Sequence, residues 1–327
     1  MKYYFTTLAI SETYFTNSLN FYKNMSERTE HALFNITTTQ SDIDNFVERF
    51  EHCHDGAYPN QEENPHIVDE FGADAESFID NVDLINSTIE WIDSNPLGSA
   101  AGYGVALPLD RKLTTKELGF KRTQINSLYI QNSRGKYEMQ IINTLKQSML
   151  DVRKFSWDMS LFLSQEFDLL KIDKAYLTGS SIMPNKHNPD VIEILRANYS
   201  ILAGQASELE NLLSLPSGYQ RDLQLTKRSL ISSFDISLKS LNILPKLIGS
   251  IKVNKSKSIA YIDEEMKMTD KVYALVAQGK PFRDAYNLIK NSDDLSSYAQ
   301  SNSKDYSEGS PGNLALDKLD ARLKKQK

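Results

Sequence analysis

The sequence predicts an all-α protein with a long central helical bundle, and three observations support that prediction. Long stretches lack glycine and proline, apolar residues within them recur at helical spacing, and alternating strand patterns are rare. A chain of 327 residues can bury a large core. We expect a divergent N-terminal part over residues 1–70, the central bundle over 71–251 and a small C-terminal helical domain over 252–327.

The first long helix is predicted over residues 73–94. Its apolar face follows a helical period: Phe78, Val82, Ile85, Ile89 and Ile92. The next residues, 95–104, read Asn-Pro-Leu-Gly-Ser-Ala-Ala-Gly-Tyr-Gly. Glycine adopts backbone angles closed to other residues. We therefore expect a tight turn here, where the backbone approaches a ligand or another chain closely.

A second long helical stretch is predicted from Lys136 to Thr178, where no glycine or proline occurs. Its apolar residues recur at a spacing close to a heptad: Ile142, Leu145, Met149, Val152, Met159 and Leu163. Helices of this length are typical of a bundle. The methionines among these residues are expected to fill the core.

Residues 178–193 read Thr-Gly-Ser-Ser-Ile-Met-Pro-Asn-Lys-His-Asn-Pro-Asp-Val-Ile-Glu. Two prolines stiffen this segment. The second, Pro189, can open a helix whose first turn holds Asp190 and Glu193, next to the positive end of the helix dipole. The sequence therefore predicts a polar loop that leads into a helix, with groups able to bind a carboxylate and move a proton beside it.

The hydroxyl of Ser180 or Ser181 is a poor base unless nearby positive charge stabilises its anion, and Lys186 is the nearest candidate in sequence. Lys186, Asn188 and the backbone N–H groups of the loop are donors for a carboxylate that gains charge in a transition state. Taken singly, such residues are more often a plain turn or a solvated lysine.

The whole string resembles the signature loop of the fumarase/aspartase superfamily, whose members cleave C–N or C–O bonds by β-elimination and release fumarate. The resemblance implies that Ser180 is the catalytic base. It implies that Lys186 and Asn188 hold the substrate carboxylate. It also implies that Glu193 pairs with a catalytic histidine.

A third helical stretch is predicted from Tyr219 to Leu244, after Pro216 and Gly218 end the preceding helix. Its stripe holds Leu223, Leu230, Phe234, Leu238 and Leu241. Helical spacing would put Tyr219 and Lys227 near one face, with Gln224 to its side. Further on, residues 279–286 read Gly-Lys-Pro-Phe-Arg-Asp-Ala-Tyr and predict a helix start at Pro281. A basic break at 252–257 and a polar loop over 291–312 complete the C-terminal part.

Together the strings at 95–104, 215–224 and 279–286 resemble argininosuccinate lyases more than other branches. The resemblance implies that Tyr219, Gln224 and Lys227 contact argininosuccinate, whereas the alternative for each is a surface polar side chain. It also implies no metal or organic cofactor, and a homotetramer whose active sites each draw on three subunits. Two other functions stay open: another fumarate-releasing lyase, such as adenylosuccinate lyase, and a catalytically silent structural or partner-dependent homologue.

The N-terminal part departs from the family. The Ser-Arg-Asn-Asp and Thr-His-x-Gln strings of argininosuccinate lyases do not occur in this sequence. The nearest counterpart of the second is Ala-Tyr-Pro-Asn-Gln at 57–61, where Asn60 stands in the place of the histidine. Asparagine does not titrate near neutral pH. The resemblance therefore predicts an N-terminally truncated or divergent member, and no residue is assigned as the acid that protonates the leaving nitrogen.

Composition excludes several classes of protein. The 43 acidic and 37 basic residues give a net charge of −6, with no basic stripe of the kind that binds nucleic acid. No apolar run is long enough to cross a membrane. The single cysteine, Cys53, fits a reducing cytoplasm. It lies in His-Cys-His-Asp at 52–55, a spacing that does not match a zinc site.

Overall fold

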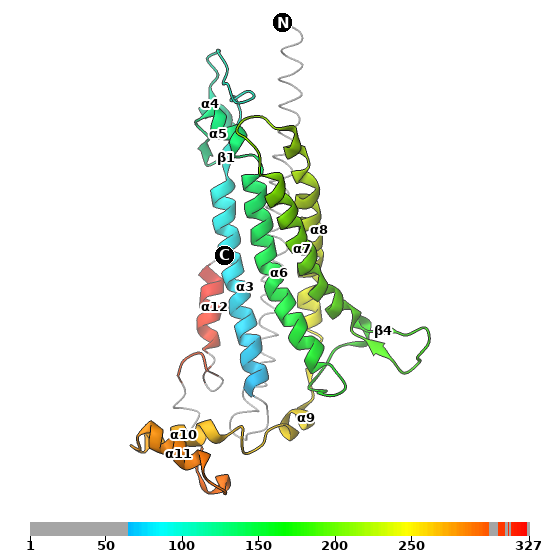
Figure 1. Ribbon diagram of the computed structural model, residues 1–327, viewed down its shortest axis with the longest axis vertical. Coiled ribbons are helices and arrows are strands. Elements are labelled where there is room, and N and C mark those ends of the chain that lie inside the picture. Colours follow the sequence, from blue (N-terminus) through cyan, green and yellow to red (C-terminus); the bar gives the residue numbers. More distant parts are fainter. Residues whose placement is uncertain (1–64, 301–306, 311–312, 314, 326–327) are drawn as a thin grey trace. The chain divides into compact units, whose positions relative to one another are not determined.

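The computed structural model describes residues 65–300, 307–310, 313 and 315–325 (Figure 1). Two compact units divide the chain. The first holds Asp80–Trp157 and Pro189–Ile248, and the second holds Asp158–Asn188 with the described residues of 65–79 and 249–325. Within the described residues the strands are three pairs of two-residue segments, so the all-α prediction is confirmed. The three-part division expected from the sequence stays a prediction.

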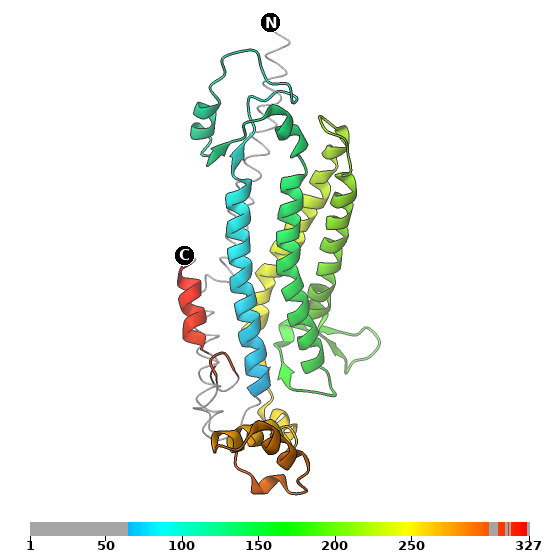
Figure 2. The ribbon, with the colours of Figure 1, turned by 60° about the vertical axis from the view of Figure 1, so that its left-hand side comes forward.

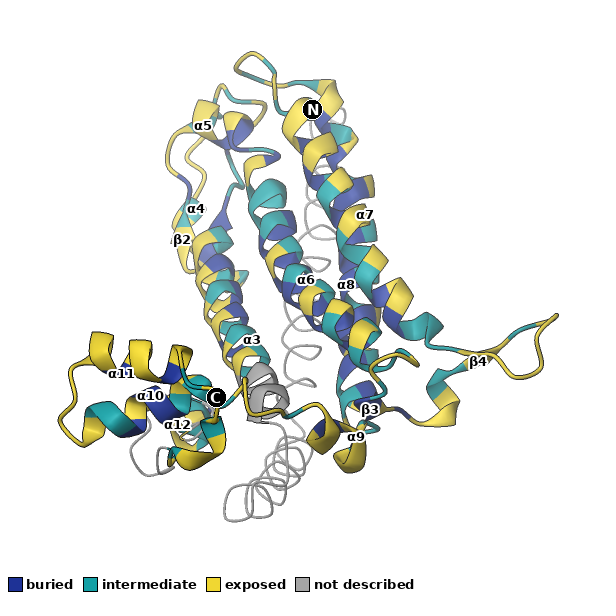
Figure 3. Ribbon diagram, turned by 60° about the horizontal axis from the view of Figure 1, so that its bottom comes forward, coloured by how far each residue is buried: buried dark blue, intermediate teal, exposed yellow. Residues whose placement is uncertain are grey.

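Four long helices form the first unit and lie side by side in both ribbon views (Figures 1 and 2). They are α3 (Pro65–Ile92), α6 (Lys136–Phe162), α7 (Asp190–Leu212) and α8 (Thr226–Ile248), of which α3 and α6 run on into the second unit. Buried positions recur along each helix (Figure 3). Met149 and Met159 are 0% and 1% exposed, which confirms the methionines as core residues.

Polar side chains connect these helices as well as apolar ones. Asn81 of α3 donates to the buried Asp151 of α6 at 2.7 Å. Ser229 of α8 donates to Glu208 of α7 at 2.6 Å. Because buried polar groups cost free energy unless they are paired, such bonds favour one register of the helices over its neighbours.

Short elements follow α3 in the first unit. Strand β1 (Ser94–Asn95) runs parallel to β2 (Arg122–Thr123). Helices α4 (Arg111–Glu117) and α5 (Ser127–Asn132) begin after side-chain caps at Asp110 and Asn126. A cap accepts hydrogen bonds from the free N–H groups of the first turn, so these caps fix where the short helices begin.

The prediction of an unbroken helical stretch from Lys136 to Thr178 is wrong in its second part. Helix α6 ends at Phe162, whose carbonyl accepts the N–H of Leu169 at 2.9 Å. Asp168 adopts a left-handed φ of 47°, which reverses the chain. The following residues form β3 (Leu170–Lys171), which pairs with β6 (Lys252–Val253) far along the chain. The absence of glycine and proline permits a helix but does not enforce one against such pairing.

The helix predicted from Tyr219 to Leu244 also has other bounds. A 3₁₀ turn, η2 (Arg221–Gln224), comes first, and α8 then starts at Thr226 and continues past Pro245 to Ile248. The predicted apolar stripe of this helix is buried at Leu230 and Leu241, which are 2% and 1% exposed. Leu223 is also buried, but from the 3₁₀ turn.

The second unit contains α9 (Lys255–Ala260), α10 (Met268–Ala277), α11 (Phe282–Lys290), η3 (Leu295–Ser297) and α12 (Leu316–Lys325). Helix α11 begins directly after Pro281, as predicted. Helices α10 and α11 pack around Val272, Ala285 and Ile289.

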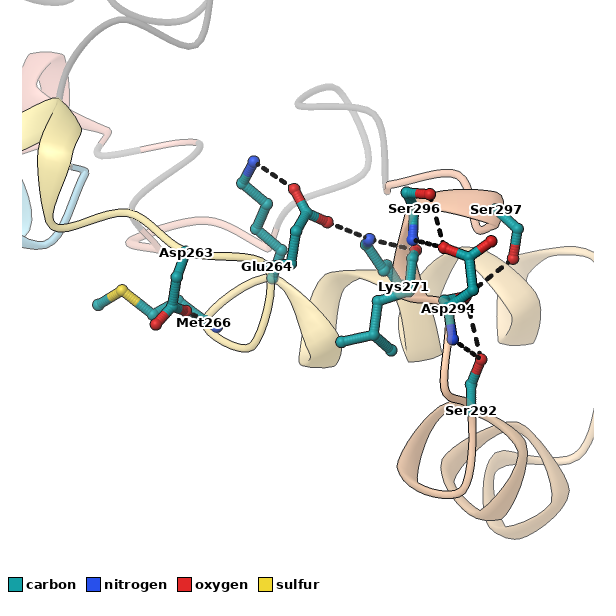
Figure 4. Close-up of polar contacts among 10 residues, drawn as sticks. Asp263, Glu264, Met266, Lys271, Ser292, Asp294, Ser296 and Ser297 are labelled. Carbon is teal, nitrogen blue, oxygen red and sulfur yellow. Dashed lines mark hydrogen bonds and ion pairs between the residues drawn. The ribbon is translucent and has the colours of Figure 1, made fainter.

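A buried lysine stabilises this part of the second unit. Lys271, on α10, is 2% exposed, and its Nζ donates to Glu264 and to the carbonyl of Leu295, both at 2.5 Å (Figure 4). Asp294 accepts from the backbone N–H of Ser296 at 3.0 Å and so caps η3. The hydrogen bonds and the ion pair satisfy the buried ammonium, which would otherwise destabilise the fold.

Candidate active site

The predicted polar loop is the tip of a β-hairpin. Strand β4 (Thr178–Gly179) pairs antiparallel with β5 (His187–Asn188), and Thr178 lies opposite Asn188. The loop therefore runs from Ser180 to Lys186, with both of its ends held by the strand pair. This hairpin is the light-green ribbon labelled β4 in Figure 1.

The backbone of the loop folds around Ser180. Its Oγ accepts hydrogen bonds from the backbone N–H of Ile182 at 3.2 Å and of Met183 at 3.0 Å. The N–H of Lys186 donates to the carbonyl of Met183 at 3.1 Å, which closes the turn. Hydrogen bonds donated to an oxygen stabilise its anionic form, so this turn supplies local support for a serine alkoxide.

The hairpin brings together three of the four predicted loop residues. Ser180 and Asn188 are partly buried, and Lys186 is exposed. The fourth, Glu193, is an exposed residue in the first turn of α7, where its N–H donates to the carbonyl of Pro189 at 3.3 Å. Helix α7 begins at Asp190 directly after Pro189, as the proline predicted.

The predicted substrate contacts lie on the segment between α7 and α8 and in the first turn of α8. Lys227, in the first turn of α8, donates from Nζ to the side-chain carbonyl of Gln224 at 3.2 Å. Burial lowers the pKa of Lys227, because a desolvated ammonium is less stable. The structure thus brings Gln224 and Lys227 into direct contact.

The prediction that Tyr219 and Lys227 share one helix face is wrong. Tyr219 lies before η2, in a turn that Gly218 enters with a left-handed φ of 104°. The turn has the physical cause that the sequence suggested, because Pro216 and Gly218 do not continue a helix. The error was to count helical spacing from Tyr219, although helical spacing begins only at Thr226.

Three residues that sequence reasoning did not select contact this segment, and all three lie at 132–138. Asn132 accepts the N–H of Gly218 at 2.7 Å. The guanidinium of Arg134 lies over the ring of Tyr219, 5.1 Å from its centroid. Glu138 accepts from the hydroxyl of Thr226 at 3.5 Å. No local pattern points to these contacts, because they join residues more than eighty positions apart.

Burial is the main influence on Glu138, which lies in the first turn of α6. Burial raises the pKa of its carboxyl group. Hydrogen bonds from the backbone N–H groups of Glu138 and Gly135, the charge of Arg134 and the hydroxyl of Thr226 oppose that shift, in this order. The carboxyl group therefore links the start of α6 to the start of α8.

Comparison with known proteins identifies the region that carries these elements. Residues 69–204 match the family model described as "Lyase". Across 252 residues the chain is 46% identical to argininosuccinate lyase from Xanthomonas oryzae pv. oryzae (strain PXO99A) and 45% identical to that from Stenotrophomonas maltophilia (strain R551-3). Each match covers 76% of this chain but 58% of the relative, so the match spans less than two thirds of the relatives' length. The resemblance to argininosuccinate lyases is confirmed.

Solved structures of the lyase superfamily share the fold. A variant of EDDS lyase with bound fumarate superposes with a TM-score of 0.68 at 18% identity, over 79% of this chain and 60% of that chain. Class II fumarase from Schistosoma mansoni superposes with a TM-score of 0.55 at 18% identity, over 68% of this chain and 55% of that chain. The predicted helical bundle of the fumarase/aspartase type is confirmed.

The glycine-rich segment 98–104 forms a tight turn, as predicted, and its first glycine packs against a side chain of the same chain. Gly98, Gly102 and Gly104 all have left-handed φ angles. A Cβ at Gly98 would lie 2.9 Å from Cγ of Arg111. The guanidinium of Arg111 donates to the carbonyls of Leu97 at 2.7 Å and of Gln124 at 2.5 Å. At Gly98 the backbone closely approaches Arg111 of the same chain, and the approach expected to a ligand or another chain stays a prediction.

No group of three or more metal-binding side chains occurs among the residues that the structure describes. The sequence 52–55, which contains Cys53, and Asn60 lie outside those residues. Within the same described part, no helix is long and apolar enough to span a bilayer.

Proposed function

We propose that this chain is an argininosuccinate lyase, which converts argininosuccinate to arginine and fumarate by β-elimination. The observation that carries the proposal is the turn in which Ser180 Oγ accepts two backbone N–H groups. It occurs in a chain 46% identical over 252 residues to curated argininosuccinate lyases. A substrate of this kind is a small molecule with carboxylates, which suits the donors of the loop.

In the proposed reaction, Ser180 removes a proton from the carbon next to a substrate carboxylate. The electron pair left on that carbon forms the new C=C bond, the C–N bond breaks, and the nitrogen leaves with a proton as arginine. Lys186 and Asn188 donate to the carboxylate, which gains negative charge before the C–N bond breaks. Glu193 takes the position that the resemblance pairs with a catalytic histidine, for which this sequence has no Thr-His-x-Gln string. Tyr219, Gln224 and Lys227 hold the substrate.

We further propose a homotetramer with active sites shared between subunits. The bundle helices support it, because large apolar side chains on them are exposed: Trp157 (48%), Ile194 (60%), Ile201 (46%) and Ile231 (48%). Exposed apolar surface on this scale is typical of an interface. The single cysteine supports a reducing compartment, and we place the activity in the cytoplasm without a metal or organic cofactor. Light scattering of the purified protein tests the assembly.

The test of the activity is fumarate formation from argininosuccinate at neutral pH, followed by absorbance. Ser180→Ala is expected to lose about 10²–10⁴-fold in rate, as loss of a general base typically does. Ser181→Ala, the neighbouring serine, is the matched control and is expected to keep most of the activity. Equal rates in wild type and Ser180→Ala would contradict the role of Ser180. Turnover of adenylosuccinate in place of argininosuccinate would contradict the substrate.

A partner-dependent homologue is the second candidate, because the Ser-Arg-Asn-Asp and Thr-His-x-Gln strings do not occur in the sequence. It predicts a folded helical protein that forms no fumarate alone but does so when mixed with a complete argininosuccinate lyase subunit carrying its own serine variant. Shared active sites make such rescue possible, since each chain would supply the part that the other lacks.

A further inference from the structure

Two segments far apart in the sequence are locked together in the first unit: 132–138, around the start of α6, and 216–227, which leads into α8. The surroundings of Gly135 show how closely the two segments pack. Its φ is 81°, and a Cβ placed on it would lie 2.1 Å from Cδ2 of Leu213 and 3.4 Å from Cδ2 of Leu223. The backbone beside Arg134 is therefore pressed against the chain on both sides of the turn that carries Tyr219.

Two residues of the 132–138 segment hold two consecutive residues of that turn. Asn132 accepts the N–H of Gly218 at 2.7 Å, and Arg134 stacks on Tyr219 with 5.1 Å between guanidinium carbon and ring centroid. No atom lies within 4 Å of where a Cβ on Gly218 would be, so the hydrogen bond to Asn132 restrains a residue that has open space on that side. Tyr219 itself is 51% exposed, so neighbours cover only half of its side chain.

The guanidinium of Arg134 combines a cation–π contact with a buried nitrogen. Its Nη1 is buried and has no hydrogen-bond partner among the described residues. Leaving a buried donor unpaired costs free energy, and each such group in a native structure calls for an explanation. The opposing charge of Glu138, in the first turn of α6, acts on the same guanidinium. Glu138 also accepts from Thr226, the residue before Lys227.

We propose that Arg134 is a positioning residue that holds Tyr219, through its ring face, in the orientation that binds the substrate. The inference rests on the proposed function, in which Tyr219 contacts argininosuccinate. A loop already held in its binding conformation gains affinity because less motion is lost when the ligand binds. Removing the stack should therefore weaken substrate binding more than it slows the chemical step.

The experiment compares Arg134→Met with Arg134→Lys, and with Arg153→Met as the matched control. Arg153 of α6 stacks on Tyr199 of α7 at the same 5.1 Å, so its variant removes an equivalent stack elsewhere in the unit. The first readout is hydrogen exchange of the backbone amides in 216–221, where every residue except Pro216 has an N–H. Arg134→Met is expected to speed that exchange about 3- to 10-fold, which matches the strength of a partly exposed cation–π contact. Arg153→Met is expected to leave it unchanged.

The second readout is steady-state kinetics with argininosuccinate. In Arg134→Met we expect KM to rise about 3- to 10-fold with kcat changed less than about 2-fold, because uniform binding is lost. Arg134→Lys keeps a cation over the ring and should recover part of the KM effect. Unchanged exchange at 216–221, or a loss of kcat without a rise in KM, would overturn the proposal. Faster exchange throughout the bundle would do so as well, since it would show that Arg134 acts only on global stability.

The two readouts separate this inference from the proposed function. If wild type forms no fumarate while Arg134→Met still loosens 216–221 selectively, the proposed function fails and Arg134 holds Tyr219 for another ligand. If wild type is active while exchange and KM are unchanged in Arg134→Met, the proposed function stands and the positioning role is wrong.

Discussion

The two segments that carry the proposed site residues differ in how tightly they pack. Ile182, in the hairpin loop that carries Ser180, is 86% exposed. Gly135, which packs against Leu213 and Leu223 on either side of the Tyr219 turn, has no room for a Cβ. The hairpin loop is held by hydrogen bonds within the segment 180–186, two of them accepted by Ser180 Oγ and one by the carbonyl of Met183. The Tyr219 turn is held by side chains from 132–138. The proposed catalytic base thus lies in a locally determined turn, and a proposed substrate contact depends on residues distant in sequence.

This difference has a functional consequence under shared active sites. Ile182 and Met183 expose apolar surface in the hairpin loop, which another subunit would cover in the proposed assembly. A turn already packed within its own unit is complete before assembly. We therefore expect overpacking at Gly135 to lower the stability of the protein, and changes in the hairpin loop to alter activity.

The largest effect on stability is expected from Gly135→Ala. The new Cβ would lie 2.1 Å from a side-chain carbon of Leu213, at a φ of 81° that alanine rarely adopts. Overpacking and backbone strain together should cost about 2–4 kcal/mol of unfolding free energy. Urea unfolding measures it.

Gly179→Ala in the hairpin is the matched control. No atom lies within 4 Å of its Cβ position, and its φ lies outside the left-handed range. Its unfolding free energy should change by less than about 0.5 kcal/mol. Equal losses of unfolding free energy in the two variants would contradict the prediction, because they would show that both regions are packed equally tightly.

The same contrast explains what the sequence could predict. Ser180, Lys186 and Asn188 fall within one short string, so a family resemblance could select them, and their roles stay a proposal. The helix that follows Pro189 was accessible from local rules. The apolar repeats were equally informative, because Ile142 and Leu145 of α6 and Leu230 and Leu241 of α8 are core residues. Local rules describe residues whose partners lie within a few positions.

Non-local contacts were not accessible. The end of α6 depends on Asp168 and on strand pairing with residues 252–253. The stack of Arg134 on Tyr219 depends on how α6 and α8 are placed. A single sequence contains no spacing that pairs these residues, so sequence analysis did not select Arg134. At the end of α6, tertiary contacts override helix propensity.

The pH dependence of Glu138→Gln sharpens the comparison, because it tests the buried link between α6 and α8. Burial raises the pKa of Glu138 above 4.5, so the folded state favours the protonated form. The stabilisation from that proton is complete below the unfolded pKa and is lost as pH rises through the folded pKa. Glutamine is neutral throughout. We expect Glu138→Gln to match wild type near about pH 4 and to have the higher Tm near about pH 8.

Thermal unfolding of both proteins at the two pH values measures this difference, and groups that titrate in both proteins cancel. A lower Tm for Glu138→Gln at the higher pH would contradict the prediction. That result would mean that the ionised carboxylate, with its bonds to Gly135 N–H and Thr226, stabilises the segment more than burial opposes it.

The smallest effect is expected from Ile182→Ser at the tip of the hairpin. A side chain that is 86% exposed buries little apolar surface, so the unfolding free energy should change by less than about 0.5 kcal/mol. The measurement should be made at two protein concentrations, because assembly stabilises a folded chain by mass action. A loss above about 1 kcal/mol at both concentrations would show that the loop packs within its own chain, against the comparison. A loss that appears only at the higher concentration would show that another subunit covers Ile182, which would support shared active sites.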